Sequence, residues 1–171
     1  FMNTSGTIWT YFSDTKNHSV MCLQYTKINE SENAVALTRK YRTGGEWNEA
    51  NWNGNITHPL GIPPYMVLTK ETGQRVATAN EPPKGTGTTP AILDILEHQD
   101  PNNTCGVFSS FEFDAPLKEE DRMSLRSCEL RIKPVGGQIT ASDECVGKFK
   151  TICKAQNYTR LYEDSCKSSG K

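Results

Sequence analysis

The segment SCELRIKPVGGQITASDECVGKFKTIC, residues 127–153, places three cysteines within one predicted strand, one Gly-Gly loop and one predicted helix. Side chains alternate between the two faces of a strand. On this strand Leu125, Ser127, Glu129 and Arg131 share one face, and Cys128, Leu130 and Ile132 share the other. The arrangement raises two questions: what the cysteines join, and which face meets the core.

The second half of the segment has the pattern of a short amphipathic helix over residues 141–154. Ser142 can cap its first turn, and Asp143 and Glu144 complement the positive end of the helix dipole. Cysteines and apolar residues then recur at helical spacing on one side, at Cys145, Phe149, Ile152 and Cys153. We expect this helix to pack on the outside of a sheet, with both of its cysteines facing the sheet.

A helix on the outside would cover the face that carries Cys128, so Glu129 and Arg131 are expected to point inward. Charged side chains in an interior are costly unless they pair with one another or with a ligand. Two interpretations remain open: a structural one, with a Glu129–Arg131 pair or Arg131 under a tryptophan, and contact with a ligand. On the strand at residues 105–113, the face opposite Cys105 carries Gly106, Phe108, Ser110 and Glu112, which leave space lined by apolar surface.

The remaining chain is predicted to consist of short strands separated by turn-rich segments. Val35, Leu37, Arg39 and Tyr41 share one face of the predicted strand at residues 34–43, and Gly44-Gly45 signals a hairpin. Further strands are expected at residues 47–56, 65–70, 74–79, 91–97, 105–113 and 123–132. This spacing favours one domain, residues 1–171, in which an antiparallel meander closes into a barrel or folds into a sandwich. A small barrel fills with side chains or holds one ligand, and Trp9 is expected to plug one end.

Charge and motifs exclude several classes of function. The formal net charge is -1 and no Lys/Arg cluster is dense enough to follow phosphates, so nucleic acid is not an expected partner. No apolar run approaches the length of a membrane span, and no signal-peptide pattern follows Phe1, so we expect a soluble, processed chain. The cysteine spacings contain no C-x2-C pair, and His18, His58 and His98 lie in no catalytic motif. The chain is therefore not expected to be an enzyme or to hold a metal or cofactor.

Sequons and cysteines point to the outside of the cell. Asn-X-Ser/Thr occurs six times, more often than chance gives, at Asn3, Asn17, Asn29, Asn55, Asn102 and Asn157. This excess predicts a secreted, extracellular glycoprotein. In that oxidising compartment the six cysteines, an even number, are expected to form disulfides.

Several motifs taken together resemble the salivary lipocalins of ticks, the histamine-binding-protein-like family. They are Cys22 ahead of Y-x-x-G-x-x-W (Tyr41, Gly44, Trp47), CGVF from Cys105, CELRI from Cys128, C-x3-F-x3-C from Cys145 to Cys153, and YEDSC ending at Cys166. The resemblance covers nearly the whole chain. It implies an eight-stranded antiparallel up-and-down lipocalin barrel with one C-terminal helix. It also implies the disulfides Cys22–Cys166, Cys105–Cys145 and Cys128–Cys153.

Members of that family bind biogenic amines, leukotrienes and fatty acids, or sterols. This chain keeps Glu129, but Gly106 and Arg131 stand where the amine binders have an acid and a tryptophan, which disfavours a cationic ligand. The resemblance therefore implies a small hydrophobic ligand, a sterol or an eicosanoid, as in a japanin-like member that modulates host immune and inflammatory responses. The expected ligand-binding residues are Leu37, Arg39, Tyr41, Tyr65, Val67, Phe108, Ser110, Glu129 and Arg131.

Two alternative functions stay open at this stage. A biogenic amine, histamine or serotonin, could use Glu129 and Asp94 inside the barrel. Otherwise the outer surface could bind a host immune-cell receptor or plasma protein, with the cavity incidental. In each case we expect a monomer.

Overall fold

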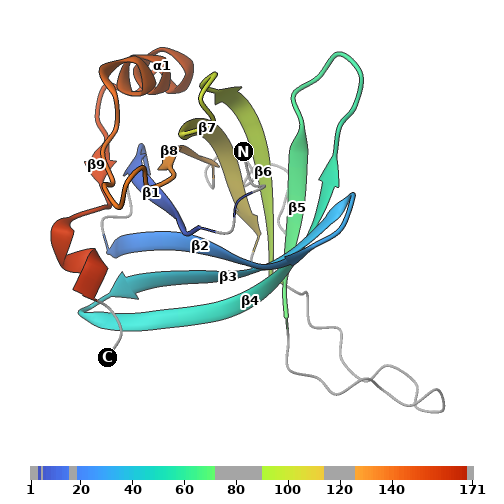
Figure 1. Ribbon diagram of the computed structural model, residues 1–171, viewed down its shortest axis with the longest axis horizontal. Coiled ribbons are helices and arrows are strands. Elements are labelled where there is room, and N and C mark those ends of the chain that lie inside the picture. The colour runs from blue at the N-terminus through green and yellow to red at the C-terminus, as the bar shows by residue number, and fades with distance from the viewer. Residues whose placement is uncertain (1–3, 5, 16–18, 72–89, 114–125, 169–171) are drawn as a thin grey trace.

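The computed structural model describes residues 4, 6–15, 19–71, 90–113 and 126–168. In this part of the chain, eight antiparallel strands close into a barrel, and one helix lies outside it against two of the strands (Figure 1). The predicted fold is therefore confirmed, and the sandwich alternative is excluded. Neither helical segment in these ranges is long and apolar enough to cross a membrane.

The described elements follow one another in the order of the chain. The barrel strands are β1 (Ile8–Ser13), β2 (Val20–Glu30), β3 (Ala34–Thr43), β4 (Glu46–Thr57), β5 (Tyr65–Lys70), β6 (Ala91–Gln99), β7 (Cys105–Phe113) and β8 (Arg126–Ile132). After them come α1 (Asp143–Cys153), the two-residue strand β9 (Thr159–Arg160) and a 3-10 turn, η2 (Asp164–Ser168). The predicted strands at residues 34–43, 65–70 and 105–113 have these bounds, whereas the one at residues 74–79 lies outside the described residues.

The strands are hydrogen-bonded in the order β2–β3–β4–β5–β6–β7–β8–β1–β9, and a further pairing of β1 with β2 closes the ring. At the β3–β4 hairpin, Gly44 and Gly45 both have positive φ, 59° and 88°, which glycine adopts without steric cost. Between these strands the pairing is unbroken from Ala34↔Asn55 to Thr43↔Glu46. The alternation of side chains then points Val35 and Leu37, both buried, into the barrel.

The closure between β1 and β2 is completed by the C-terminal segment. β1 pairs with β2 at only two positions, Ile8↔Tyr25 and Trp9↔Gln24. Beyond them, Leu161 donates its N–H to Tyr11 O (2.9 Å) and accepts the Cys22 N–H (2.7 Å). The Leu161 side chain, 2% exposed, belongs to the apolar cluster inside the barrel. The C-terminal segment thus forms part of the barrel wall.

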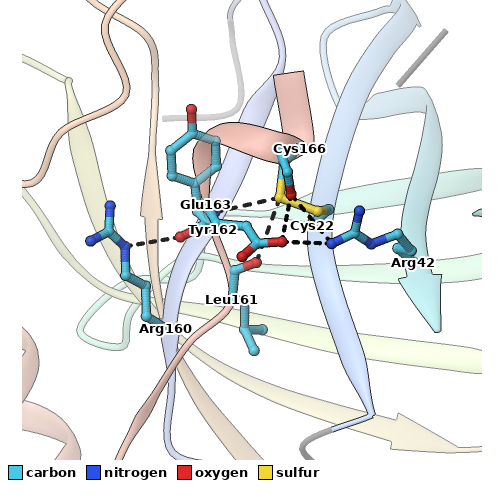
Figure 2. The surroundings of a disulfide bond; sticks show 8 residues. Cys22, Arg42, Arg160, Leu161, Tyr162, Glu163 and Cys166 are labelled. Atoms are coloured by element: carbon cyan, nitrogen blue, oxygen red, sulfur yellow. Dashed lines mark hydrogen bonds and ion pairs between the residues drawn. A yellow bond between two sulfur atoms is a disulfide. The ribbon is translucent and has the colours of Figure 1, made fainter. Parts of the chain in front are cut away.

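A disulfide holds this segment in place, as Figure 2 shows. Cys22 of β2 is bonded to Cys166 of η2, 144 residues later in the chain. Beside it, Arg42 Nη2 of β3 donates to Glu163 Oε1 at 2.6 Å. Cys22, Glu163 and Cys166 lie close together, but both sulfurs belong to the disulfide and are not available to a metal ion.

Helix α1 is joined to the outside of the barrel as the sequence predicts. Ser142 is its N-cap and accepts the Cys145 N–H at 3.2 Å. The buried residues of the helix are Cys145, Phe149 and Cys153. Two disulfides, Cys105–Cys145 to β7 and Cys128–Cys153 to β8, fix the helix to the sheet. All three pairings implied by the family resemblance are present.

Trp9 does not lie where we expected. Trp9 is on the outer face of β1, in the cluster beneath α1 and the C-terminal segment, with its ring 5.3 Å from that of Tyr162. The prediction that Trp9 plugs a barrel end is therefore wrong, because Thr10 and Ile8 are the inward residues of β1. Trp52 of β4 does point inward and is 6% exposed.

The sequons are accessible wherever the structure describes them. Asn29, Asn55, Asn102 and Asn157 are all exposed, and Asn3 and Asn17 lie outside the described residues. Exposure is required for glycosylation, which stays a prediction.

The β6–β7 turn is organised by one buried carboxylate. Asp100, 7% exposed, accepts the N–H groups of Asn102 (3.2 Å), Thr104 (2.6 Å) and Cys105 (2.7 Å). Burial raises the pKa of Asp100, but these N–H groups and the Thr104 hydroxyl lower it more, so the pKa lies below its ordinary value. The turn is therefore stabilised by the ionised form.

We expect Asp100→Asn to lower the free energy of unfolding by about 2 kcal/mol at pH 7, as is typical of hydrogen bonds to a charged group. A depressed pKa stabilises the fold above the unfolded-state value, about 4, and this contribution is lost as pH falls through the folded-state pKa. Urea unfolding of wild type and variant at pH 7 and pH 3 should show the difference shrinking in acid. A difference of the same size at both pH values would contradict this role.

Candidate functional site

A cavity of about 500 Å³ lies at the end of the barrel that carries the β2–β3 and β4–β5 turns. Its walls come from β3, β4, β5, β6 and β7, and its rim comes from the two turns. The lining residues are Glu30, Ser31, Glu32, Val35, Ile56, His58, Pro64, Tyr65, Met66, Asp94, Leu96 and Phe108. This volume lies in the usual range for small-molecule sites.

The walls are mainly apolar because the inward positions of successive strands carry apolar side chains. Val35, Ile56, Met66, Leu96 and Phe108 supply this surface. At Gly54, between them, an added Cβ would lie 2.8 Å from Leu68 and 2.9 Å from Val35. A side chain at this position of β4 would therefore displace Val35 and Leu68 from their present packing.

The floor of the cavity is polar and carries Asp94 of β6, which is 1% exposed. Asp94 forms a two-point ion pair with Arg131 of β8: Nη1 donates to Oδ2 at 2.5 Å and Nη2 donates to Oδ1 at 3.0 Å. Ser110 Oγ of β7 also donates to Oδ1, at 2.6 Å. Three strands thus meet at one carboxylate.

Arg131 is fully enclosed and lies between two aromatic rings. Its guanidinium carbon is 4.4 Å from the ring centroid of Tyr25 and 4.4 Å from that of Phe108. Burial alone lowers the pKa of Arg131, but Asp94, Tyr25 and Glu129 raise it well above its ordinary value. Arg131 therefore stays charged while having no exposed surface.

Glu129 completes this buried network from the same strand. Its Oε2 accepts Arg131 Nε at 2.8 Å and the Thr10 hydroxyl at 3.3 Å. The network holds one cation, Arg131, and two carboxylates, those of Asp94 and Glu129. Both Glu129 and Arg131 point inward as predicted, and Arg131 is engaged in ion pairs within the protein.

The opposite end of the barrel interior holds a second ion pair. Arg39 Nη2 of β3 donates to Glu112 Oε1 of β7. The Arg39 guanidinium lies over Tyr41, 5.3 Å from its ring centroid, and 6.0 Å from that of Trp52. Arg39 and Tyr41, which we expected to bind ligand, belong to this layer and do not line the cavity.

Of the nine residues expected to bind ligand, Tyr65 and Phe108 line the cavity. Leu37 is buried in the apolar core, and Ser110, Glu129 and Arg131 lie in the polar network, where Ser110 supports Asp94 from below. Val67 is 37% exposed on the outer face of β5, so its placement inside was wrong. The inward residues of this strand are Met66 and Leu68, which are 4% and 0% exposed.

Sequence reasoning missed most of the cavity. Val35 shares a face with Leu37, so the alternation in β3 could have identified it. Glu30 is the last residue of β2 and Glu32 lies in the β2–β3 turn, and the position of this turn relative to the barrel interior has no signature in the sequence. The sequence analysis named Asp94 as a contact for an amine, but not its pairing with Arg131, which lies 37 residues away, since three strands must meet before the two come together.

Comparison with known proteins rests on structure alone, since no family model and no curated sequence matches this chain. The AM182 serotonin complex superposes with a TM-score of 0.57 at 10% identity, covering 95% of this chain and 85% of that one. The fold is the lipocalin barrel. Japanin from Rhipicephalus appendiculatus, bound to cholesterol, gives a TM-score of 0.53 at 14% identity and covers 95% of this chain and 96% of that one.

A third structure with this lipocalin barrel is the siderocalin Ex-FABP, which is described as having dual ligand specificities. It superposes with a TM-score of 0.56 at 9% identity, over 91% of this chain and 87% of that one. At such identities the likeness extends to the fold and not to particular binding residues. The ligand of this chain must therefore be argued from its own cavity.

Proposed function

We propose that this chain is a non-enzymatic carrier whose cavity holds one small, neutral and mainly apolar ligand of sterol size. The observation that supports it best is the cavity of about 500 Å³ with apolar walls, in which the one buried charged group, Asp94, is already paired with Arg131. Apolar pockets with a few placed polar groups are typical of small-molecule sites.

The charge distribution favours a sterol over an eicosanoid or fatty acid. No lysine or arginine is among the residues described as lining the cavity. Arg131, which we expected to bind ligand, lies beneath the floor and donates to Asp94, Glu129 and Tyr25. A carboxylate ligand would meet acidic groups and lose its hydration without gaining a cation.

The biological setting is proposed from the sequence and the comparisons together. Six sequons and three disulfides support a secreted, extracellular glycoprotein. The resemblance to tick salivary lipocalins supports a salivary protein that modulates host immune and inflammatory responses. A structure with the same barrel holds cholesterol, which supports a sterol as the cargo here.

One observation favours an amine as a second candidate ligand. Glu30 and Glu32 lie at the cavity rim and Asp94 at its floor, so the carboxylates outnumber cations around this space. A structure with the same barrel holds serotonin. We rank the amine second because Glu30 is paired with Lys27 at 2.8 Å and Asp94 with Arg131 at 2.5 Å.

A tryptophan at position 96 tests which ligand uses the cavity. Leu96→Trp should fill part of the cavity, while Val67→Trp, on the outer face of β5, is the matched control. Calorimetric titration with cholesterol, arachidonate and serotonin should show one tight site for cholesterol in wild type and in Val67→Trp. In Leu96→Trp the affinity should fall at least about tenfold, equivalent to 1.4 kcal/mol.

Serotonin binding tightly while cholesterol does not would reverse the ranking of the two ligands. Unchanged cholesterol binding by Leu96→Trp would place the ligand elsewhere.

The same two variants, applied to host immune cells, distinguish an activity that depends on the bound ligand from one carried by the outer surface of the protein. If Leu96→Trp keeps full activity on the cells, the outer surface carries it through a receptor or plasma protein.

A further inference from the structure

We propose that Asp94 selects, within the proposed carrier function, ligands whose polar end is a neutral hydrogen-bond donor, a hydroxyl group. Arg131 acts as a positioning residue that holds the carboxylate at the cavity floor and offsets its charge. The cavity would then recognise the polar end of its ligand through a hydrogen bond and hold the apolar remainder by shape complementarity.

Asp94 has more hydrogen-bond acceptor positions than its partners in the protein use. A carboxylate offers about four acceptor positions, two on each oxygen. Oδ1 accepts Ser110 Oγ and Arg131 Nη2, and Oδ2 accepts Arg131 Nη1. One acceptor position on Oδ2 therefore has no partner among the described residues, and Asp94 lines the cavity.

Among the described residues, the donors that contact Asp94 are already engaged with it and with other groups of the protein. The Ser110 hydroxyl gives its proton to Asp94 at 2.6 Å. Arg131 donates through Nε to Glu129 and through Nη2 to Tyr25 and Asp94, and it does not line the cavity. A ketone oxygen or a carboxylate at this position would face an acceptor and leave its own lone pairs unsatisfied, which is unfavourable in a buried site.

Charge decides between a hydroxyl group and an ammonium group. The Arg131 guanidinium is bound to both oxygens of Asp94, so a ligand cation at Oδ2 would also approach a fixed positive charge. A neutral donor uses the free acceptor without that repulsion. The chemistry at the floor thus fits an alcohol better than an amine, and either better than an acid.

Three sterols that share the ring skeleton and side chain and differ chiefly in the oxygen group on carbon 3 test the proposal on the wild-type protein. Cholesterol carries a hydroxyl group there, cholestenone a ketone, and cholesterol sulfate an anion. Cholesterol should bind roughly tenfold more tightly than cholestenone, the usual effect of one buried hydrogen bond, and the sulfate more weakly still. Equal affinities for alcohol and ketone, or a preference for the ketone, would overturn the proposal.

Substitutions then test whether Asp94 causes the preference for an alcohol over a ketone. In Asp94→Asn, the side-chain amide can turn its NH₂ group toward a ketone, so the alcohol-to-ketone affinity ratio should fall to about one or below. Asp143→Asn, at an exposed position of helix α1 outside the barrel, is the matched control and should leave the ratio unchanged. An Asp94→Asn protein that is folded by circular dichroism and keeps the full ratio would overturn the assignment.

A second variant applies if Asp94→Asn does not fold. Ser110→Ala removes one donor from Oδ1 and frees a further acceptor position, so the ratio should be kept or increased. Its loss would contradict the role of Asp94. Failure of all three sterols to bind wild type would refute the carrier function itself, whereas equal binding of cholesterol and cholestenone would refute only the selection by Asp94.

Discussion

Arg131→Met is expected to lower the free energy of unfolding by about 3–5 kcal/mol at pH 7, the usual result of removing one partner from a buried ion pair. Met approximates the length of the arginine stem but supplies no charge, so Asp94 and Glu129 would remain enclosed, at 1% and 4% exposure, without a cation. The aromatic contacts of Arg131 with Tyr25 and Phe108 would also lose their cationic component. Urea unfolding followed by tryptophan fluorescence measures the change.

The matched control removes all three charges together. The triple variant Asp94→Asn, Glu129→Gln, Arg131→Met should be more stable than Arg131→Met alone, because no unpaired carboxylate is left inside. A loss below about 1 kcal/mol, the range of an exposed ion pair, would show that solvent reaches this network.

The second large effect is expected from the disulfide that anchors the C-terminal segment. Replacing Cys22 and Cys166 with alanine opens a loop of 144 residues. The chain-entropy model assigns about 5 kcal/mol to such a loop. In addition, the Leu161 N–H and the Cys22 N–H, which connect the C-terminal segment to β1 and β2, should exchange with solvent faster.

Cys128–Cys153 provides the comparison, since it closes a loop of 25 residues. Its replacement with two alanines should cost about 3.5 kcal/mol in the same model and leave exchange at Leu161 unchanged. Denaturant unfolding and hydrogen exchange of the two variants separate the two contributions. A smaller loss for Cys22–Cys166 than for Cys128–Cys153 would mean that the C-terminal segment holds its place without the bond.

Local patterns predicted most of the fold. The alternation in β3 and β8 identified the inward faces of Leu37, Glu129 and Arg131, because a strand has only two faces and the cysteines of α1 fixed which one is outside. The cap at Ser142 and the spacing of Cys145 and Cys153 predicted the helix because the residues that indicate it lie close together in the sequence, within about four helical turns.

Features that depend on distant strands could not be predicted in this way. In β5, apolar residues at both Met66 and Val67 left the register ambiguous by one residue, and the wrong face was chosen. The role of Arg131 depended on Asp94, which no local pattern connects to it. Trp9 was misplaced because its outward cluster exists only when the C-terminal Tyr162 packs over β1.

The central claim is that the cavity between the β2–β3 and β4–β5 turns carries one neutral apolar molecule. Native mass spectrometry of the protein secreted by eukaryotic cells, with no ligand added, tests it most directly. We expect a single mass increment that vanishes on denaturation, is extracted as a neutral lipid alcohol, and is absent from Leu96→Trp but present in Val67→Trp. The same increment in Leu96→Trp, or a charged molecule as the extracted cargo, would contradict the account.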